Sequence, residues 1–242
     1  MSRTLVIGDI HGCMRHLDAL LQSISPATND HLIFLGDYID RGPDSAGVLR
    51  TIISLTRTHH VTAILGNHEE MMLAARASQL PDAPRESQGS LHDKLSDWLR
   101  NGGDATLKSY AGVRGTLRDV PPEHWQFLQT ALVDYLETDS HIFVHANAYP
   151  DVAMPEQPDY MLRWERCDAI APHQSGKIIV CGHTPQTSGK PMNRGYAICL
   201  DTNACRSGPL TCLDTVSGRV WQAFEDGHVE RAHISDFAND DT

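Results

Sequence analysis

The chain has 242 residues, with 20 Lys and Arg against 31 Asp and Glu, and its formal net charge is −11. Hydrophobic residues make up 40% and charged residues 21%, which is typical of a folded globular protein and excludes disorder as the main state. An acidic chain lacks the basic surface that nucleic acids and anionic membranes require, and its apolar runs are too short to cross a bilayer. We therefore expect neither as a partner, and an anionic substrate would need bound cations.

The six cysteines are scattered and form no Cys-x-x-Cys pair. Structural zinc sites need closely paired thiolates, so the spacing argues against a zinc ribbon and indicates reduced, mostly buried thiols. The sequence enters an apolar run at Thr4 without a secretory segment. Both features are typical of a cytoplasmic protein.

The first third alternates short apolar runs with helix-period segments. Strands are predicted at residues 4–7, 31–35 and 61–65, and each is followed by apolar residues at helical spacing. This alternation predicts parallel β-α-β units.

Residues 79–132 differ in character and predict a helical insertion over the sheet. A polar loop at 79–93 precedes helical patterns at 91–100, 104–111 and 122–131. The loop is either a lid over the substrate or a plain surface excursion, and the sequence favours neither.

Short strands return in the last part of the chain, separated by loops rich in Pro and Gly. They are predicted at residues 133–137, 141–145, 177–181, 196–201, 210–214 and 219–223. We expect one domain over residues 1–234, followed by a frayed acidic tail at 235–242.

A polar cluster follows each of the first three predicted strands. The clusters are Gly8-Asp9-Ile10-His11-Gly12, Gly36-Asp37-Tyr38-Ile39-Asp40-Arg41-Gly42 and Gly66-Asn67-His68-Glu69. Two later strands end at His145 and at His183. Ligands of open α/β sheets bind beyond the carboxyl ends of the strands, so we expect these side chains to converge.

Carboxylate and amide oxygens combined with imidazole suit Mn²⁺, Fe²⁺ or Zn²⁺, with Mn²⁺ the first choice. Two neighbouring ions need a shared carboxylate, and Asp37 is the natural bridge. The ions together with Arg41 would supply the positive charge that the chain lacks.

The motifs G-D-x-H-G, G-D-x-x-D-R-G, G-N-H-E, a strand-end His and G-H-T, in this order, resemble the phosphoprotein phosphatase family of calcineurin-like metallophosphoesterases. The resemblance extends to Trp98-Leu99-Arg100-Asn101-Gly102-Gly103 and to Asp201-Thr202. It is strongest toward the small bacterial and phage branch typified by bacteriophage lambda protein phosphatase. The resemblance implies an α/β fold in which two mixed β-sheets pack face to face and are flanked by helices.

The resemblance also implies a role for each matching residue. Its predicted metal ligands are Asp9, His11 and Asp37 for one ion, and Asp37, Asn67, His145 and His183 for the other. His68 would be the general acid, oriented by Asp40. Arg41, Asn67 and Arg166 would bind the substrate phosphate, with Arg163 as the alternative to Arg166. Glu69 is expected to cap its helix, and a supporting role beside Asn67 stays open.

The expected activity is metal-dependent hydrolysis of phosphomonoesters, foremost of serine/threonine phosphoproteins, with phosphotyrosine and aryl phosphates also accepted. A symmetrical bis(5'-nucleosyl)-tetraphosphatase is the alternative, because it shares these motifs. Near the motifs only Tyr38 and Tyr149 could stack on a nucleobase, which favours phosphopeptides. A non-catalytic scaffold is a remote alternative, since every ligand position and the acid are present.

Overall fold

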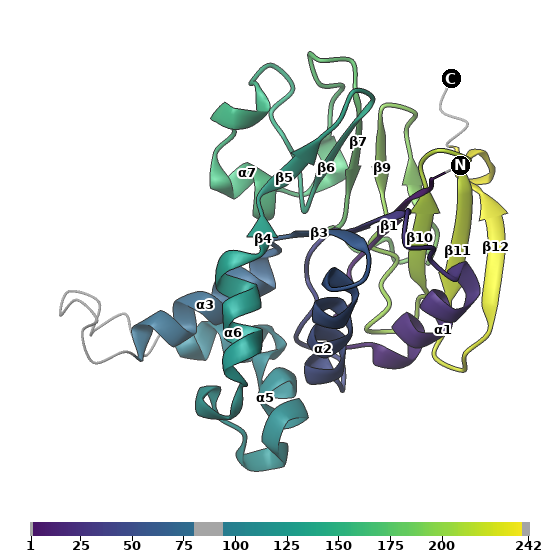
Figure 1. The fold of residues 1–242 in the computed structure, drawn as a ribbon. Helices are drawn as coiled ribbons and strands as arrows, with labels where there is room; N and C mark the ends of the chain where they lie inside the picture. The colour runs from purple at the N-terminus through teal and green to yellow at the C-terminus, as the bar shows by residue number, and fades with distance from the viewer. Residues whose placement is uncertain (1, 80–93, 239–242) are drawn as a thin grey trace.

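The computed structural model describes residues 2–79 and 94–238. Its centre is a pair of β-sheets with helices outside, shown as a ribbon in Figure 1. The predicted loop at 79–93 lies, but for its first residue, outside the described residues.

The first sheet has seven strands in the order β12-β11-β10-β1-β2-β3-β4. Their bounds are β1 (Thr4–Ile7), β2 (His31–Phe34), β3 (His60–Ile64), β4 (Leu132–Val133), β10 (Leu210–Asp214), β11 (Arg219–Ala223) and β12 (Val229–His233). Strands β1 to β4 are parallel, whereas β10, β11 and β12 are antiparallel to their neighbours. The β-α-β prediction for the first third is confirmed.

The second sheet has five strands in the order β5-β6-β7-β9-β8. They are β5 (Tyr135–Glu137), β6 (His141–Val144), β7 (Ile178–Cys181), β8 (Met192–Asn193) and β9 (Ala197–Cys199). The three central strands are parallel and both edge strands are antiparallel. Both sheets are therefore mixed, as the resemblance implied.

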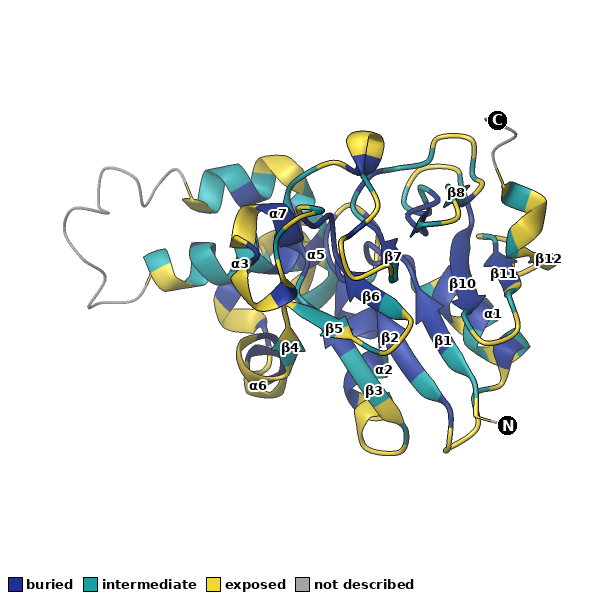
Figure 2. Cartoon of the chain, turned by 90° about the horizontal axis from the view of Figure 1, so that it is seen from above, coloured by how far each residue is buried: buried dark blue, intermediate teal, exposed yellow. Residues whose placement is uncertain are grey.

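Side chains of one strand pack against two different layers, because successive residues of a strand point to opposite faces of the sheet. Leu5 and Ile7 of β1 pack in the cluster beneath the helices, whereas Val6 packs with Phe143 and Val180 between the two sheets. Figure 2 shows the central strands of both sheets buried and the outer loops and helix faces exposed.

Helices cover the first sheet and its end. They are α1 (Met14–Ile24), α2 (Ser45–Thr56), α3 (Asn67–Ser78), α5 (Asp104–Ala111) and α6 (Pro122–Thr130), while α7 (Asp159–Arg163) packs on the second sheet. Helix α2 begins where the side chain of Asp44 accepts a hydrogen bond from the Gly47 N–H. The short helical turns are η2 (Leu99–Gly103), η3 (Gly112–Arg114), η4 (Leu117–Asp119), η5 (Met154–Glu156), η6 (Cys167–Ala169) and η7 (Ile234–Phe237). No helix among residues 2–79 and 94–238 is long and apolar enough to cross a membrane.

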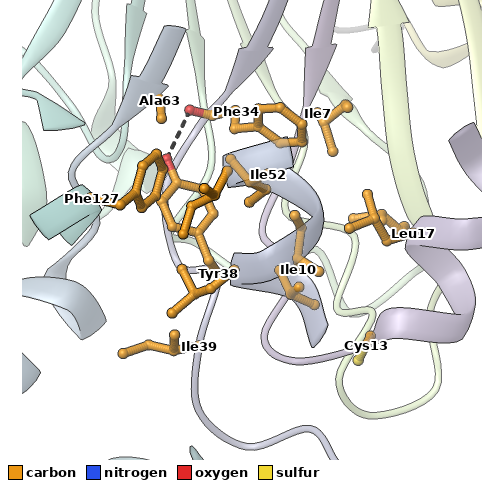
Figure 3. Packing of buried hydrophobic residues seen from close by; sticks show 14 of the residues in the cluster. Ile7, Ile10, Cys13, Leu17, Phe34, Tyr38, Ile39, Ile52, Ala63 and Phe127 are labelled. Atoms are coloured by element: carbon orange, nitrogen blue, oxygen red, sulfur yellow. Dashed lines mark hydrogen bonds between the residues drawn. The ribbon is translucent and has the colours of Figure 1, made fainter. Parts of the chain in front are cut away.

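Tyr38 fixes the loop that follows β2 to the core (Figure 3). Its ring is fully buried beside Phe34 and Phe127, and its hydroxyl lies 2.5 Å from the Ile64 carbonyl and 3.3 Å from the Phe34 carbonyl. This loop carries Asp37, Asp40 and Arg41, so the core holds three predicted site residues in place.

Two details of the predicted elements are wrong. The run 133–137 is not one strand, because it divides at Asp134 into β4 of the first sheet and β5 of the second. The tail does not fray from residue 235, because η7 follows β12 and Asn193 Nδ2 donates to the Ile234 carbonyl.

Candidate active site

Most of the predicted site residues lie in loops, several of which have an unusual backbone, while Asn67 and His68 begin α3. Seven non-glycine residues in the described part of the chain have positive φ, and five of them are His11, Asp37, Asp40, Arg41 and His183. Such conformations cost free energy and concentrate at functional sites. The loops at the strand ends are therefore shaped by the site rather than by local preference.

Glycines beside these residues allow the loops to approach closely. A Cβ at Gly182 would lie 2.0 Å from Asp9 Oδ1, and a Cβ at Gly36 would lie 2.7 Å from His145 Nδ1. Gly36 also has φ +104°, which favours glycine. This explains why glycine stands next to the predicted ligands.

Asp37 lies between two groups of histidines. Its Oδ2 is 3.4 Å from His11 Nε2, and its Oδ1 is 3.4 Å from His145 Nε2. The Asn67 Oδ1 atom is 3.0 Å from His145 Nε2 and 3.1 Å from His183 Nδ1. The two carboxylate oxygens of Asp37 thus face two separate groups of atoms that could bind a metal.

Each of the three predicted histidine ligands is oriented by a backbone carbonyl. His11 Nδ1 is 2.8 Å from the Ile39 carbonyl, and His145 Nδ1 is 2.8 Å from that of Leu35. His183 uses its other nitrogen, with Nε2 3.0 Å from the Trp164 carbonyl. A ring N–H held in this way leaves the opposite nitrogen free to bind a metal, as metal-binding histidines do.

Burial keeps these three imidazoles neutral. It lowers the pKa of His11 and of His145, and it lowers the pKa of His183 to about 4. Neutral imidazole is the form that binds a cation.

The buried carboxylates of the site repel one another, so bound cations would stabilise their charged form. Asp9 is buried, and both of its oxygens accept from the His183 N–H at 3.0 and 3.2 Å. Burial, reinforced by Asp201 and Asp37, raises the pKa of Asp9, and burial raises the pKa of Asp201 to about 7. Oxygen and imidazole donors around these three acids fit two divalent cations such as the resemblance implies.

Asp201 belongs to this cluster although the sequence assigned it no role. It is 2% exposed and follows β9, whose direction is parallel to β7. The signal that locates it is the one used for the other residues, an acidic side chain just after a parallel strand.

His68 differs from the other histidines in its partner. Its Nδ1 lies 2.7 Å from Asp40 Oδ2, a carboxylate rather than a carbonyl. Burial opposes protonation, but Asp37 and Asp40 outweigh it and raise the pKa of His68. Its Nε2 faces the same space as His11 and Asp37, so His68 can present a proton there.

A buried network holds Asp40. Trp98 Nε1 donates to Oδ2 at 2.9 Å, and Thr106 Oγ1 donates to Oδ1 at 2.6 Å. Both partners come from the predicted insertion, which therefore contributes to the site.

Arg41 lies at the mouth of the site, whereas Arg166 pairs with a neighbouring acid. The Arg41 Nη1 and Nη2 atoms are 2.7 Å from His11 Nε2 and 2.9 Å from His68 Nε2. Arg166 is exposed and its Nε donates to Asp168 at 2.6 Å, so its phosphate role stays a prediction. Arg163 is buried and pairs with Glu70, Asp134 and Asp159.

Glu69 caps the start of α3, as expected. Its carboxylate accepts from the backbone N–H groups of Asp37 at 2.9 Å, Tyr38 at 2.8 Å and Gly66 at 3.2 Å. It therefore supports the loops that carry Asp37 and Asn67.

The chain is similar to known phosphoesterases. The sequence model described as calcineurin-like phosphoesterase matches residues 2–187. A relative from Chromohalobacter salexigens, named bis(5'-nucleosyl)-tetraphosphatase, symmetrical, is 28% identical over 280 residues and covers 96% of this chain and 99% of its own.

Two other relatives match shorter regions. One from Nitrosomonas europaea with the same name is 40% identical over 104 residues, covering 40% of this chain and 38% of the relative. Serine/threonine-protein phosphatase 1 of Salmonella typhimurium is 45% identical over 100 residues, covering 41% of this chain and 38% of the relative. The chain thus spans less than half the length of these two relatives.

Solved structures support the fold alone. The crystal structure of a proposed diadenosine tetraphosphatase has a TM-score of 0.61 at 20% identity, covering 96% of this chain and 93% of the other. A cold-active protein-tyrosine phosphatase of Shewanella has a TM-score of 0.59 at 18% identity, covering 96% and 80%. The α/β architecture with two mixed sheets is confirmed.

Proposed function

The chain belongs to the calcineurin-like phosphoesterase family, and from that premise we propose that it is a metal-dependent hydrolase of symmetrical dinucleoside tetraphosphates. The observation that carries the hydrolytic part is the position of Asp37, whose two oxygens face separate histidine groups. The proposed metal ligands are Asp9, His11, Asp37, Asn67, His145 and His183, and the proposed ions are two Mn²⁺.

When bound, the two cations supply positive charge that lowers the pKa of water and offsets the charge of the phosphate. The protein holds the metal-binding side chains in place. Backbone carbonyls fix the three imidazoles, and the Asp37 carboxylate lies between the two histidine groups.

His68 is the proposed proton donor to the leaving oxygen. Its Nδ1 is bound by Asp40, so the proton offered to the substrate would be on Nε2, which requires Arg41 Nη2, now 2.9 Å from that atom, to turn to the phosphate. Asp40 orients the ring and favours its charged form.

Arg41 and Asn67 are the proposed phosphate ligands. The Arg41 guanidinium is the one cation that reaches both His11 and His68 among the described residues, so it can bind an oxygen of the phosphate placed between them. Arg166 is retained as a further phosphate ligand, which requires its side chain to leave Asp168.

The full-length relatives favour the dinucleotide over the phosphoprotein that the motifs alone favoured. The Chromohalobacter relative extends over nearly all of both chains, whereas the match to the protein phosphatase covers 41% of this chain. The substrate preference is therefore reversed from the sequence prediction.

A cavity beside the site gives room for a nucleoside. It has a volume of about 530 Å³ and is lined by Glu70, Met71, Ala74, Lys94, Asp97, Asn101 and Trp164. The Trp164 carbonyl binds His183, and the residue after Asn101 accepts a hydrogen bond from the Arg41 N–H. The cavity therefore adjoins both sides of the site, and Trp164 supplies the aromatic surface that neither the buried Tyr38 nor Tyr149 offers there.

A phosphoprotein is the second candidate substrate, because the match to the Salmonella phosphatase has the higher identity, 45%. A non-catalytic scaffold is disfavoured, since His68 and Asp40 retain a buried hydrogen bond that serves proton transfer.

A substrate panel tests the proposal. The Mn²⁺-loaded enzyme is assayed for kcat/KM with diadenosine tetraphosphate, a phosphoserine peptide and p-nitrophenyl phosphate, alongside Trp164→Ala. We expect the dinucleotide to be preferred, and the variant to lose about 5-fold or more on it, since base–aromatic stacking contributes about 1–3 kcal/mol. Tyr160→Ala, an exposed aromatic that does not line the cavity, is the control. Preference for the phosphopeptide, with Trp164→Ala equal to the control, would establish the second candidate instead.

A further inference from the structure

Three cysteine side chains converge behind the active site. Cys167 begins η6, Cys181 ends β7 and Cys199 ends β9, and their Sγ atoms all lie within 4.8 Å of one another. Each of them is 0% exposed. Cys181 and Cys199 are directly opposite in the parallel pairing of their strands, and Cys167 reaches them from a separate loop.

The surroundings hold these thiols in fixed positions. Cys199 Sγ is 3.2 Å from the Gly182 carbonyl and 3.4 Å from that of Thr184. The Cys167 N–H donates to Thr184 Oγ1 at 2.9 Å, which fixes the loop that carries the third thiol.

We propose that these three thiols form a binding site for a soft, thiophilic cation, with monovalent copper the best fit. Sulfur ligands select copper(I) or zinc over the harder cations that suit the carboxylate and imidazole centre. Structural zinc sites are almost always four-coordinate, and within the described residues the group comprises three Cys without a fourth His, Cys, Asp or Glu. A three-sulfur site closed to solvent therefore favours the monovalent ion.

The cysteine cluster has its own ligands but lies next to the proposed dinuclear centre. Cys181 is followed directly by Gly182 and His183, and the His183 N–H binds Asp9. The copper site is thus distinct in its donors but shares a strand end with the phosphoesterase centre. The proposal does not depend on which phosphoester the enzyme hydrolyses.

The test is a copper(I) competition. Reduced, Mn²⁺-loaded enzyme is titrated with copper(I) against bathocuproine disulfonate under anaerobic conditions, and X-ray absorption identifies the donor atoms. We expect one equivalent of copper with sulfur donors only. Loss of a supporting contact at a metal site weakens binding about 10–100-fold, and we expect Cys167→Ser, which removes a ligand, to weaken it more than that.

Two matched variants keep the test decisive. Cys212→Ser also changes a fully buried thiol, in the first sheet and outside the cluster, and is expected to bind copper like the wild type. Cys199→Ser repeats the test should Cys167→Ser fail to fold, as judged by circular dichroism. Equal affinity in wild type and Cys167→Ser, nitrogen donors in the absorption spectrum, or a disulfide formed in place of binding would each overturn the proposal.

Discussion

Asp40→Asn tests the assignment of His68 as the proton donor, because it removes a charge and keeps the shape. The Asp40 carboxylate is 0% exposed, and its Oδ2 accepts from His68 Nδ1 at 2.7 Å and Trp98 Nε1 at 2.9 Å. An asparagine oxygen can accept both bonds, and the amide N–H can donate to Thr106 Oγ1 on the other side. We therefore expect the fold and the metal content to be unchanged.

The size of the effect follows from this hydrogen bond. A bond to a charged group contributes about 1.5–3 kcal/mol, and about 1.36 kcal/mol corresponds to a tenfold change in rate. Asp40→Asn should therefore slow a reaction that needs the proton by about 10- to 100-fold. His68→Asn removes the donor itself and should cost about 10²–10⁴-fold.

The assay compares leaving groups. An alkoxide leaving from phosphoserine nearly requires a proton, whereas a nucleoside diphosphate and nitrophenolate are both weak bases and leave largely unaided. We expect both variants to lose more kcat/KM on phosphoserine than on the other two substrates. Metal content is measured alongside by elemental analysis. Asp226→Asn changes an exposed Asp–His pair and is the control. Equal losses on phosphoserine and p-nitrophenyl phosphate would refute the role of His68, and loss of one metal ion in His68→Asn would make it a ligand instead.

Asp37→Asn is expected to lower the content of both cations together, because its two oxygens face separate histidine groups; two tightly bound ions with normal turnover would contradict the bridge. Gly182→Ala is expected to lower metal content by elemental analysis, since its Cβ would lie 2.0 Å from Asp9 Oδ1. Glu69→Ala removes the acceptor for the N–H groups of Asp37 and Tyr38 and should cost about 3 kcal/mol of unfolding free energy in urea, with the exposed Glu225→Ala as control. Burial opposes the ionised form of Asp30, but hydrogen bonds from Arg3 lower its pKa from 3.8 to about 2, a difference worth about 2 kcal/mol. That contribution is present above the unfolded pKa and is lost as the pH falls toward 2, so Asp30→Asn should unfold more easily at neutral pH and show a flatter loss of stability in acid.

The sequence could predict that the proposed ligands converge because parallel strands place their carboxyl ends at one edge. Asp9, Asp37 and Asn67 each follow a strand of the first sheet, and His145 and His183 follow strands of the second. Apolar periodicity locates the strands, and the residue after each strand is then placed without knowledge of distances. The same logic reaches Asp201, once a carboxylate after β9 is given the same weight as the others.

Features set by tertiary contacts were beyond the sequence. β12 is an edge strand with Glu230 and Arg231 exposed, so it lacks the apolar alternation that marks a buried strand. Asp134, where the run divides between the two sheets, pairs with Arg163, which is distant in sequence. The thiols of Cys181 and Cys199 meet through strand register and that of Cys167 reaches them from a loop, neither of which their spacing in the chain indicates.

Different parts of the fold carry the proposed metal ligands and the cavity that can select the substrate. The proposed metal ligands lie on loops between or after strands, and this arrangement acts on a phosphate whatever it is attached to. The cavity that can distinguish one leaving group from another is instead lined by α3, the segment before α5 and Trp164. Trp98 and Thr106 do not line the cavity but belong to the same helical region and bind Asp40, so this region also positions the proposed acid. Changes in this region can therefore alter the leaving group accepted and its protonation together, without altering the metal ligands.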